Sequence, residues 1–428
     1  MSKNFLPPFF LGIIAVLILV YQINKPFVGH HDFNNVFYGN MARNLLRYPL
    51  SETKLGQVTN SGWVQNSHEF VYHTHHPPLL VWLLAVSYKL FGIFEVSTRL
   101  VPVVFSVLTV VFFYFLVRRL SNGKVALATA VFWLTTPLFI YFGKMAVQEV
   151  LVLFFFVFSF WVYFFAPKLL LPALFLAALS GWPGYYVSFI IWLYDRKKTI
   201  VLAVPFLAFG LHLFQNWLLT GLALGGGLAS AFTLRSGSVA LLPYLQKEAS
   251  WILAYFTKPL VILSVVGLLV LPKHSVTPFL IFGLTHLIFF RQAVERHDYL
   301  IYYLLPFITL SAAWFLERIL KNNKLFFLAV IIIAAASFWS GRFFSQALLA
   351  SDYAKDGYTV GRLINKVTGP KETVLVIDDK IYNNFDWQVV FYGDRKVTIL
   401  PQPATKITSN WIVKRETDGS FGMAEINL

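Results

Sequence analysis

Apolar runs of the kind that cross a lipid bilayer recur along most of this chain, and they constrain its fold more than any other feature. A bilayer core takes about 20 helical residues, so each run is a candidate spanning helix, although several are shorter. The runs fall at 5–21, 99–117, 125–142, 148–166, 169–181, 184–194, 199–218, 258–271, 277–290, 299–316 and 325–341. Charged residues make up only 13% of the 428 residues. This excludes soluble enzymes, coiled coils, disordered tails and compact nucleic-acid-binding domains.

The net charge of +15 indicates topology, because Lys and Arg collect in the cytoplasmic loops of membrane proteins. Basic clusters stand at every second junction between the runs: Lys3, Arg118 to Lys124, Lys168, Arg196 to Lys198, Lys273 and Arg318 to Lys324. If successive spans alternate in direction, all these clusters lie on the cytoplasmic side under two conditions. Residues 78–92 must not span the membrane, and residues 169–194 must form two short helices broken at 181–184. We therefore predict eleven spans, with the N-terminus inside and the C-terminus outside. The first run has no cleavage signal behind it and is predicted to be a retained anchor.

The composition changes after residue 341. Residues 342–428 have ordinary charge density, with a helix-like stretch at 352–367 and strand-like runs at 373–377, 388–392 and 396–400. We predict a small extracytoplasmic α/β domain there. Residues 1–341 are predicted to form the membrane domain, with a long first outer loop at 25–98 that carries interfacial helices. The expected fold class is an all-α polytopic membrane protein with a C-terminal α/β domain.

Ionisable side chains are scarce within the runs and gather at the predicted outer rim. Asp32 follows the first run and precedes a helical pattern, so it is either an N-cap or a general base. Glu149 opens the fourth span, where the helix dipole also favours an acid. The topology places both carboxylates on the same side of the membrane.

Histidines and one basic segment accompany these acids at the outer rim: His30, His31, His73, His75, His76 and Arg296-His297-Asp298-Tyr299. Imidazoles and carboxylates are ligands for divalent metals, but no spacing here is diagnostic, and contacts to phosphate or water are an alternative. The Arg296 segment either grips an anion or anchors the chain at the interface. The chain has no cysteine, which excludes disulfides, thiolate metal sites and Cys nucleophiles.

Several stretches together resemble the membrane glycosyltransferases of the GT-C class. They are the acid after the first run, His75 to Trp82, Lys89 to Glu95, Arg99 to Pro102, Tyr141 to Lys144 with Glu149, and His297 to Leu300 ahead of Leu305-Pro306. The likeness covers residues 5–318 and is nearest to the family 39-like group of protein O-mannosyltransferases and lipid A aminoarabinose transferases. It implies a GT-C fold and a sugar donor on a polyprenyl phosphate. It also implies transfer to a protein, lipid or glycan acceptor at the outer face of the cell membrane.

The resemblance puts Asp32 in the place of the first-loop catalytic acid, while Phe33 stands where many relatives have a second acid. His76 stands where some relatives carry a Lys that contacts the lipid phosphate. An acceptor hydroxyl needs a base, and a leaving phosphate needs positive charge or hydrogen-bond donors. We therefore expect Asp32 as the base and Glu149 as an orienting group. The expected phosphate ligands are His76, Lys144, Arg296, His297 and Tyr299, and the further candidates are His31, His75, Asn35 and Arg43.

This mechanism requires no cofactor, and a divalent metal is the alternative that the histidines leave open. A secondary transporter usually shows two related halves and broken helices at mid-membrane, which the sequence lacks. A non-catalytic receptor or subunit would leave the grouping of acids and histidines unexplained. We therefore expect a membrane glycosyltransferase, transferring a hexose or pentose by a single inverting displacement, with no nucleic-acid partner.

Overall fold

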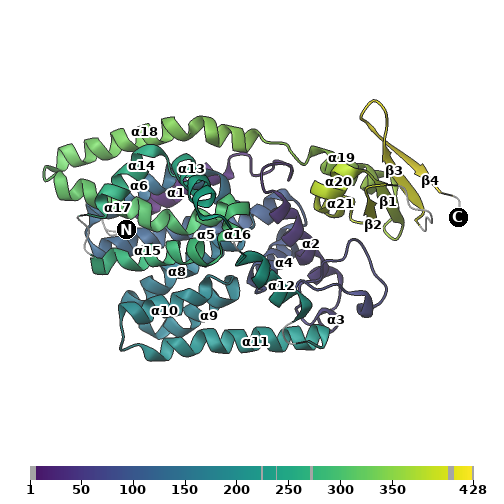
Figure 1. The fold of residues 1–428 in the computed structure, drawn as a ribbon, viewed down its shortest axis with the longest axis horizontal. Coiled ribbons are helices and arrows are strands. Elements are labelled where there is room, and N and C mark those ends of the chain that lie inside the picture. Colours follow the sequence, from purple (N-terminus) through teal and green to yellow (C-terminus); the bar gives the residue numbers. More distant parts are fainter. Residues whose placement is uncertain (1–5, 223–224, 238, 270–272, 403–408, 427–428) are drawn as a thin grey trace. The chain divides into compact units, whose positions relative to one another are not determined.

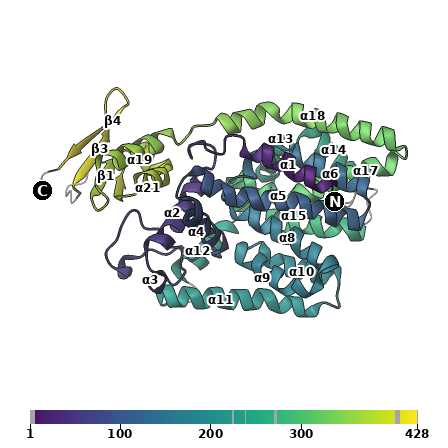
Figure 2. The ribbon, with the colours of Figure 1, turned by 180° about the vertical axis from the view of Figure 1, so that it is seen from behind.

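The computed structural model of the chain describes residues 6–222, 225–237, 239–269, 273–402 and 409–426 (Figures 1 and 2). Lys3 and the first residue of the run at 5–21 lie outside these ranges. The chain forms two compact units. Unit 1 comprises Met1–Ile23, His75–Leu80 and Leu100–Ala347, and unit 2 comprises Asn24–Thr74, Val81–Arg99 and Leu348–Leu428. Much of the first loop thus groups with the C-terminal segment, while the predicted division at residue 341 stays a prediction.

The helices of unit 1 are mostly apolar, as expected in lipid, where a helix satisfies its own backbone hydrogen bonds. They are α1 (Leu6–Val20), α5 (Glu95–Leu120), α6 (Gly123–Leu134), α7 (Pro137–Phe142), α8 (Gln148–Phe165), α9 (Leu170–Ser180), α10 (Gly184–Tyr194), α11 (Ala203–Thr220), α12 (Gly225–Arg235), α13 (Leu241–Tyr255), α14 (Lys258–Gly267), α15 (Lys273–Phe289), α16 (Arg291–Arg296), α17 (Leu305–Ile319) and α18 (Asn323–Ala350). The 3₁₀ helices η2 (Pro167–Leu169), η3 (Thr199–Leu202) and η4 (Asp298–Leu304) connect some of them. Helix α5 begins, and α18 ends, in unit 2.

Five helical stretches among the described residues are long and apolar enough to cross a membrane: Glu95–Leu120, Gln148–Phe165, Thr199–Thr220, Asp298–Ile319 and Asn323–Val367. The pair α13 and α14, bent by 111°, adds a sixth if it is one broken span. Several shorter apolar helices accompany them, and the chain is a multi-pass membrane protein. The predicted number of eleven spans stays a prediction.

The predicted break inside 169–194 is confirmed. Helix α9 ends at Ser180 and α10 begins at Gly184. A Cβ atom at Gly184 would overlap the backbone carbonyl of Ala177, so the close approach of the two helices requires glycine there. The segment predicted not to span forms α4 (Leu79–Phe91), whose 13 residues are too few for a bilayer core.

Unit 2 combines the first loop with a small α/β fold. Its other helices are α2 (Phe33–Arg47), α3 (Leu50–Thr53), η1 (Ser67–Glu69), α19 (Lys355–Val367), α20 (Asp379–Asn384) and α21 (Asp386–Gly393). Its strands are β1 (Thr373–Ile377), β2 (Lys396–Leu400), β3 (Trp411–Arg415) and β4 (Phe421–Glu425), in the sheet order β2-β1-β3-β4. Strand β1 is parallel to β2 and β3, and β4 is antiparallel to β3.

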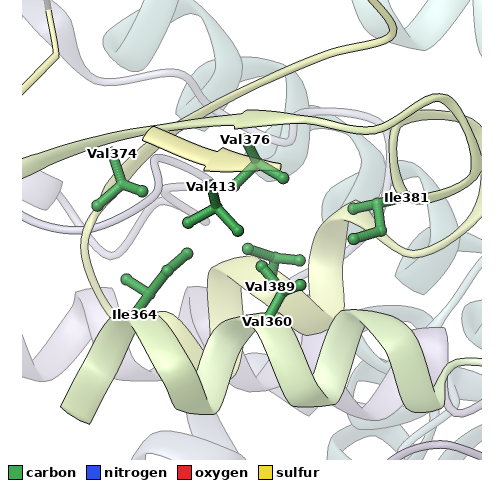
Figure 3. Close-up of a cluster of buried hydrophobic side chains, with 7 residues drawn as sticks. All are labelled: Val360, Ile364, Val374, Val376, Ile381, Val389 and Val413. Atoms are coloured by element: carbon green, nitrogen blue, oxygen red, sulfur yellow. The ribbon is translucent and has the colours of Figure 1, made fainter. Parts of the chain in front are cut away.

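The core of this α/β fold lies between its helices and the sheet. Figure 3 shows Val360 and Ile364 of α19 directed toward Val374 and Val413 of the strands. Val376, Ile381 and Val389 complete this buried cluster. Helix α21 packs against α19 and also against α2 of the first loop. It therefore joins the α/β fold to the helix that follows Asp32.

The predicted strand at 388–392 is wrong, because these residues lie in α21. Asp386 occupies the first turn of that helix, and Asp394 ends it in the left-handed conformation. The Val389-Val390 pair favours a strand locally, but packing of the helix on α19 and α2 outweighs that propensity. The helix predicted at 352–367 is confirmed as α19, and the strands predicted at 373–377 and 396–400 are confirmed as β1 and β2. Strands β3 and β4 were not predicted.

Candidate functional site

Asp32 lies at the N-cap position of α2 but does not cap the helix. Its side chain makes no hydrogen bond to a helix N–H, and the residue is only 5% exposed. Instead Oδ2 accepts the Gly29 N–H at 2.7 Å, and Oδ1 accepts the side-chain amide of Asn35 at 2.7 Å. These bonds hold the carboxylate in one orientation, which is the arrangement a general base requires.

Two cations surround this carboxylate within unit 2. The Arg99 guanidinium lies 3.5 Å from Asp32 Oδ1, rests over the Phe27 ring and donates to the Lys25 carbonyl. The Lys25 ammonium donates to the carbonyls of Leu349 and Ser351. Burial lowers the pKa of Lys25, and the charge of Asp32 opposes this effect. Arg99 was part of the sequence resemblance but had no predicted role, and the structure shows it beside Asp32.

The other first-loop candidates have different surroundings. His31 has a positive φ of 57°, and its ring centre lies 4.2 Å from that of His30. Asn35 holds Asp32 directly. Arg43 lies about three turns along α2 from Asp32, where it pairs with Asp394 at 2.8 Å and donates to the Phe391 carbonyl. Its contacts in unit 2 are therefore structural, and a ligand role for Arg43 stays a prediction without support from these contacts.

A second group of polar side chains lies within unit 1, around the segment that ends the first loop. The Trp182 indole donates to the His75 carbonyl at 2.7 Å, and the Gln148 amide donates to the Pro77 carbonyl at 3.5 Å. These bonds fix the backbone on either side of His76. The Arg235 guanidinium of α12 donates to Nε2 of His76. Glu149 of α8 lies close enough to Arg235 for their charges to interact.

Arg235 was missed by the sequence analysis. It lies between the apolar runs at 199–218 and 258–271, in a connection that the predicted topology places outside. A basic residue on the face opposite the cytoplasmic clusters was a signal that could have identified it. Its charge also affects His75. Burial, Arg235 and His212 together lower the pKa of His75 from 6.5 to about 4, so this imidazole is neutral at physiological pH.

The remaining predicted phosphate ligands also lie in unit 1, with the following contacts. The Lys144 ammonium donates to the Tyr21 carbonyl, which ties the start of α8 to the end of α1. Arg296 is exposed at the end of α16. The His297 and Tyr299 rings lie 5.3 Å apart, and Tyr299 also contacts Phe142. Their assignment to the donor phosphate stays a prediction.

The histidine segment has features of both a metal site and an anion site. Neutral imidazoles such as His75 are ordinary metal ligands. However, a guanidinium has only donors, so the Arg235 contact occupies the acceptor nitrogen of His76 and places a fixed positive charge beside both rings. A phosphate could accept hydrogen bonds from Arg235 there, so both alternatives stay open.

Sequence comparisons place the chain near glycosyltransferases. The family described as dolichyl-phosphate-mannose-protein mannosyltransferase matches residues 75–214. An uncharacterised protein of Aquifex aeolicus (strain VF5) is 31% identical over 196 residues, which are 44% of this chain. That match spans only 36% of the relative's own length.

Solved structures extend the comparison to almost the whole chain. ArnT from Cupriavidus metallidurans bound to undecaprenyl phosphate matches with a TM-score of 0.66 and 13% identity, over 94% of this chain and 87% of that protein. AglB, an oligosaccharyltransferase from Archaeoglobus fulgidus in complex with an inhibitory peptide and a dolichol-phosphate, matches with a TM-score of 0.61 and 13% identity, over 100% and 75%. The oligosaccharyltransferase of A. fulgidus in complex with Zn and sulfate matches with a TM-score of 0.58 and 15% identity, over 97% and 73%. The chain therefore has the GT-C fold, as expected from the sequence.

Proposed function

We propose that this protein is a membrane glycosyltransferase that moves a sugar from a polyprenyl-phosphate donor to an acceptor hydroxyl. The observation that carries the proposal is the Asp32 carboxylate, buried in a GT-C fold and held by Gly29 and Asn35 rather than capping α2. ArnT and AglB were solved with undecaprenyl phosphate and dolichol-phosphate, which supports a lipid phosphate as the donor carrier. We place the reaction at the outer face of the cell membrane, from the distribution of basic clusters in the sequence.

The proposed reaction is a single displacement at the anomeric carbon. Asp32 takes the proton of the acceptor hydroxyl as its oxygen attacks, and the bond from the anomeric carbon to the phosphate oxygen breaks. The electron pair leaves with the polyprenyl phosphate, whose growing negative charge requires fixed positive charge. Within unit 1, Arg235 beside His76 is the candidate for this charge. One displacement inverts the anomeric configuration.

Transfer by the purified full-length protein tests this proposal. Vesicles containing the protein are supplied with polyprenyl-phosphate sugars and an extract of cell-envelope acceptors, and release of polyprenyl phosphate is measured. We expect Asp32→Asn to lower turnover by about two to four orders of magnitude, because an amide cannot take the proton. Donor binding, measured separately, should be retained in this variant. Turnover of Asp32→Asn equal to wild type would remove Asp32 as the base.

The same assay addresses cofactor dependence and the rival functions. No cofactor enters the proposed reaction, so treatment with EDTA should leave turnover unchanged. Loss of turnover with EDTA, restored by Zn²⁺, would establish the metal-dependent alternative. Binding of donor without any release of polyprenyl phosphate, across all acceptor fractions, would favour a non-catalytic receptor.

A further inference from the structure

The loop that carries Asp32 is bonded along its length to the C-terminal segment of unit 2. The Phe27 N–H donates to the Tyr392 hydroxyl at 2.8 Å, and the His30 N–H donates to the Ser351 hydroxyl at 2.9 Å. The Val28 carbonyl accepts the Ala354 N–H at 3.0 Å. These partners lie more than 300 residues away in the chain. The loop is therefore held by the C-terminal segment as well as by its own local hydrogen bonds.

Tyr392 of α21 makes the most informative of these contacts. Its hydroxyl accepts from Phe27 and donates to Glu95 Oε1 at 2.8 Å. Burial, reinforced by the charge of Glu95, raises the pKa of Tyr392, so the hydroxyl keeps the proton it donates. Phe27 in turn is fully buried, and its ring supports the Arg99 guanidinium that faces Asp32. Tyr392 is thus connected to Asp32 by a chain of contacts through Phe27 and Arg99.

Helix α21 also contacts α2, the helix that follows Asp32 in the chain. Helix α2 begins directly after Asp32, and its Arg43 and Arg47 both pair with Asp394 at the end of α21. Arg43 also donates to the Phe391 carbonyl and lies over the Phe391 ring. Residues 391–394 therefore bind the loop before the carboxylate and the helix after it.

We propose that α21 is a positioning element for the catalytic base, with Tyr392 and Asp394 fixing the two segments that flank Asp32. This inference rests on the proposed function of Asp32. It assigns the C-terminal α/β fold a role in turnover, although none of its residues is placed on the substrate. Displacement of a base by about 1 Å can lower the rate of a reaction about 100-fold, so contacts remote from the chemistry can control kcat.

Tyr392→Phe in the full-length protein is the sharpest test. The variant keeps the ring and removes only the hydroxyl, which leaves the Phe27 N–H and the Glu95 carboxylate without this partner. We expect kcat to fall about 10- to 100-fold while the KM for the donor is unchanged, because donor binding does not depend on the base. Tyr382→Phe, which removes an exposed hydroxyl from α20, is the matched control and should keep wild-type kinetics.

Hydrogen exchange separates this inference from the proposed function. Amides of residues 24–35 should exchange faster in Tyr392→Phe than in wild type, and this can be measured whether or not transfer is observed. Wild-type exchange in this loop, or an unchanged kcat, would overturn the positioning role. If Tyr392→Phe does not fold, Asp394→Asn is the second variant, and it should speed exchange and lower kcat in the same way. A lower yield of folded Asp394→Asn with wild-type kcat per folded molecule would also overturn it.

Discussion

At the scale of single residues, the structure adds Arg235 as a candidate phosphate ligand that the sequence analysis missed. Arg235→Ala should lower kcat/KM for the polyprenyl-phosphate donor by about 10- to 100-fold, as expected for loss of a charge-assisted bond to phosphate. Arg235→Lys should lower kcat/KM less than Arg235→Ala, because lysine keeps the positive charge but cannot form the bidentate hydrogen bonds of a guanidinium. Donor titrations with both variants measure the effect.

Arg296→Ala is the matched comparison for that experiment. Arg296 was predicted from the sequence as a phosphate ligand, yet it is exposed at the end of α16. We expect its removal to change donor kinetics less than removal of Arg235. A larger effect of Arg296→Ala than of Arg235→Ala would instead favour the Arg296 segment as the phosphate-binding site.

The lowered pKa of His75 predicts a pH-dependent stability. The unfolded chain binds a proton at His75 near pH 6.5, whereas the folded chain does so only near pH 4. As pH falls from about 6.5 to about 4, the unfolded state therefore binds more protons, and stability is lost across this window. His75→Asn should flatten this part of the thermal stability profile measured by tryptophan fluorescence. An unchanged slope in the variant would show that another group titrates there.

At the scale of elements, the contact between α2 and α21 depends on one small residue. A Cβ atom at Gly39 would lie 2.6 Å from the Tyr88 hydroxyl and 2.9 Å from the Phe391 ring. Gly39→Ala should therefore push α2 away from α21 and destabilise the protein by about 1–3 kcal/mol. Thermal unfolding of the variant, compared with Gly123→Ala at an uncrowded glycine, measures this cost. Equal melting temperatures for the two variants would contradict the packing described here.

Sequence patterns predicted the elements that local chemistry determines. The break at 181–184 follows from Gly and Pro, and the strand at 373–377 follows from a buried run of Val, Leu and Ile. They failed at residues 388–392, where the same β-branched residues lie in a helix that tertiary packing selects. At the candidate site, the helix predicted after Asp32 is confirmed as α2, but the contact of Asp32 with Arg99 and that of His76 with Arg235 depend on the fold. No local pattern reports contacts between residues so far apart.

At the scale of the whole molecule, the eleven-span topology is still a prediction. It requires the cluster at Arg196 to Lys198 inside and the C-terminus outside. Reporter fusions placed after Lys198 and after Leu428 should report cytoplasmic and extracytoplasmic locations, respectively. Two cytoplasmic results would remove the predicted common face of Asp32 and Glu149.

The interleaving of the two units along the chain has a consequence for how the protein is made. The Asp32 loop leaves the ribosome on the order of tens of seconds before Ser351 and Tyr392, at ordinary rates of synthesis. During that interval the helices of unit 1 that follow the loop in the chain are synthesised, while the loop lacks these partners. The Asp32 loop therefore acquires these partners only after the last part of the chain has been made and has folded. From the proposed positioning role of α21 we expect a nascent or truncated copy to be inactive, so that activity begins only once the polypeptide is whole.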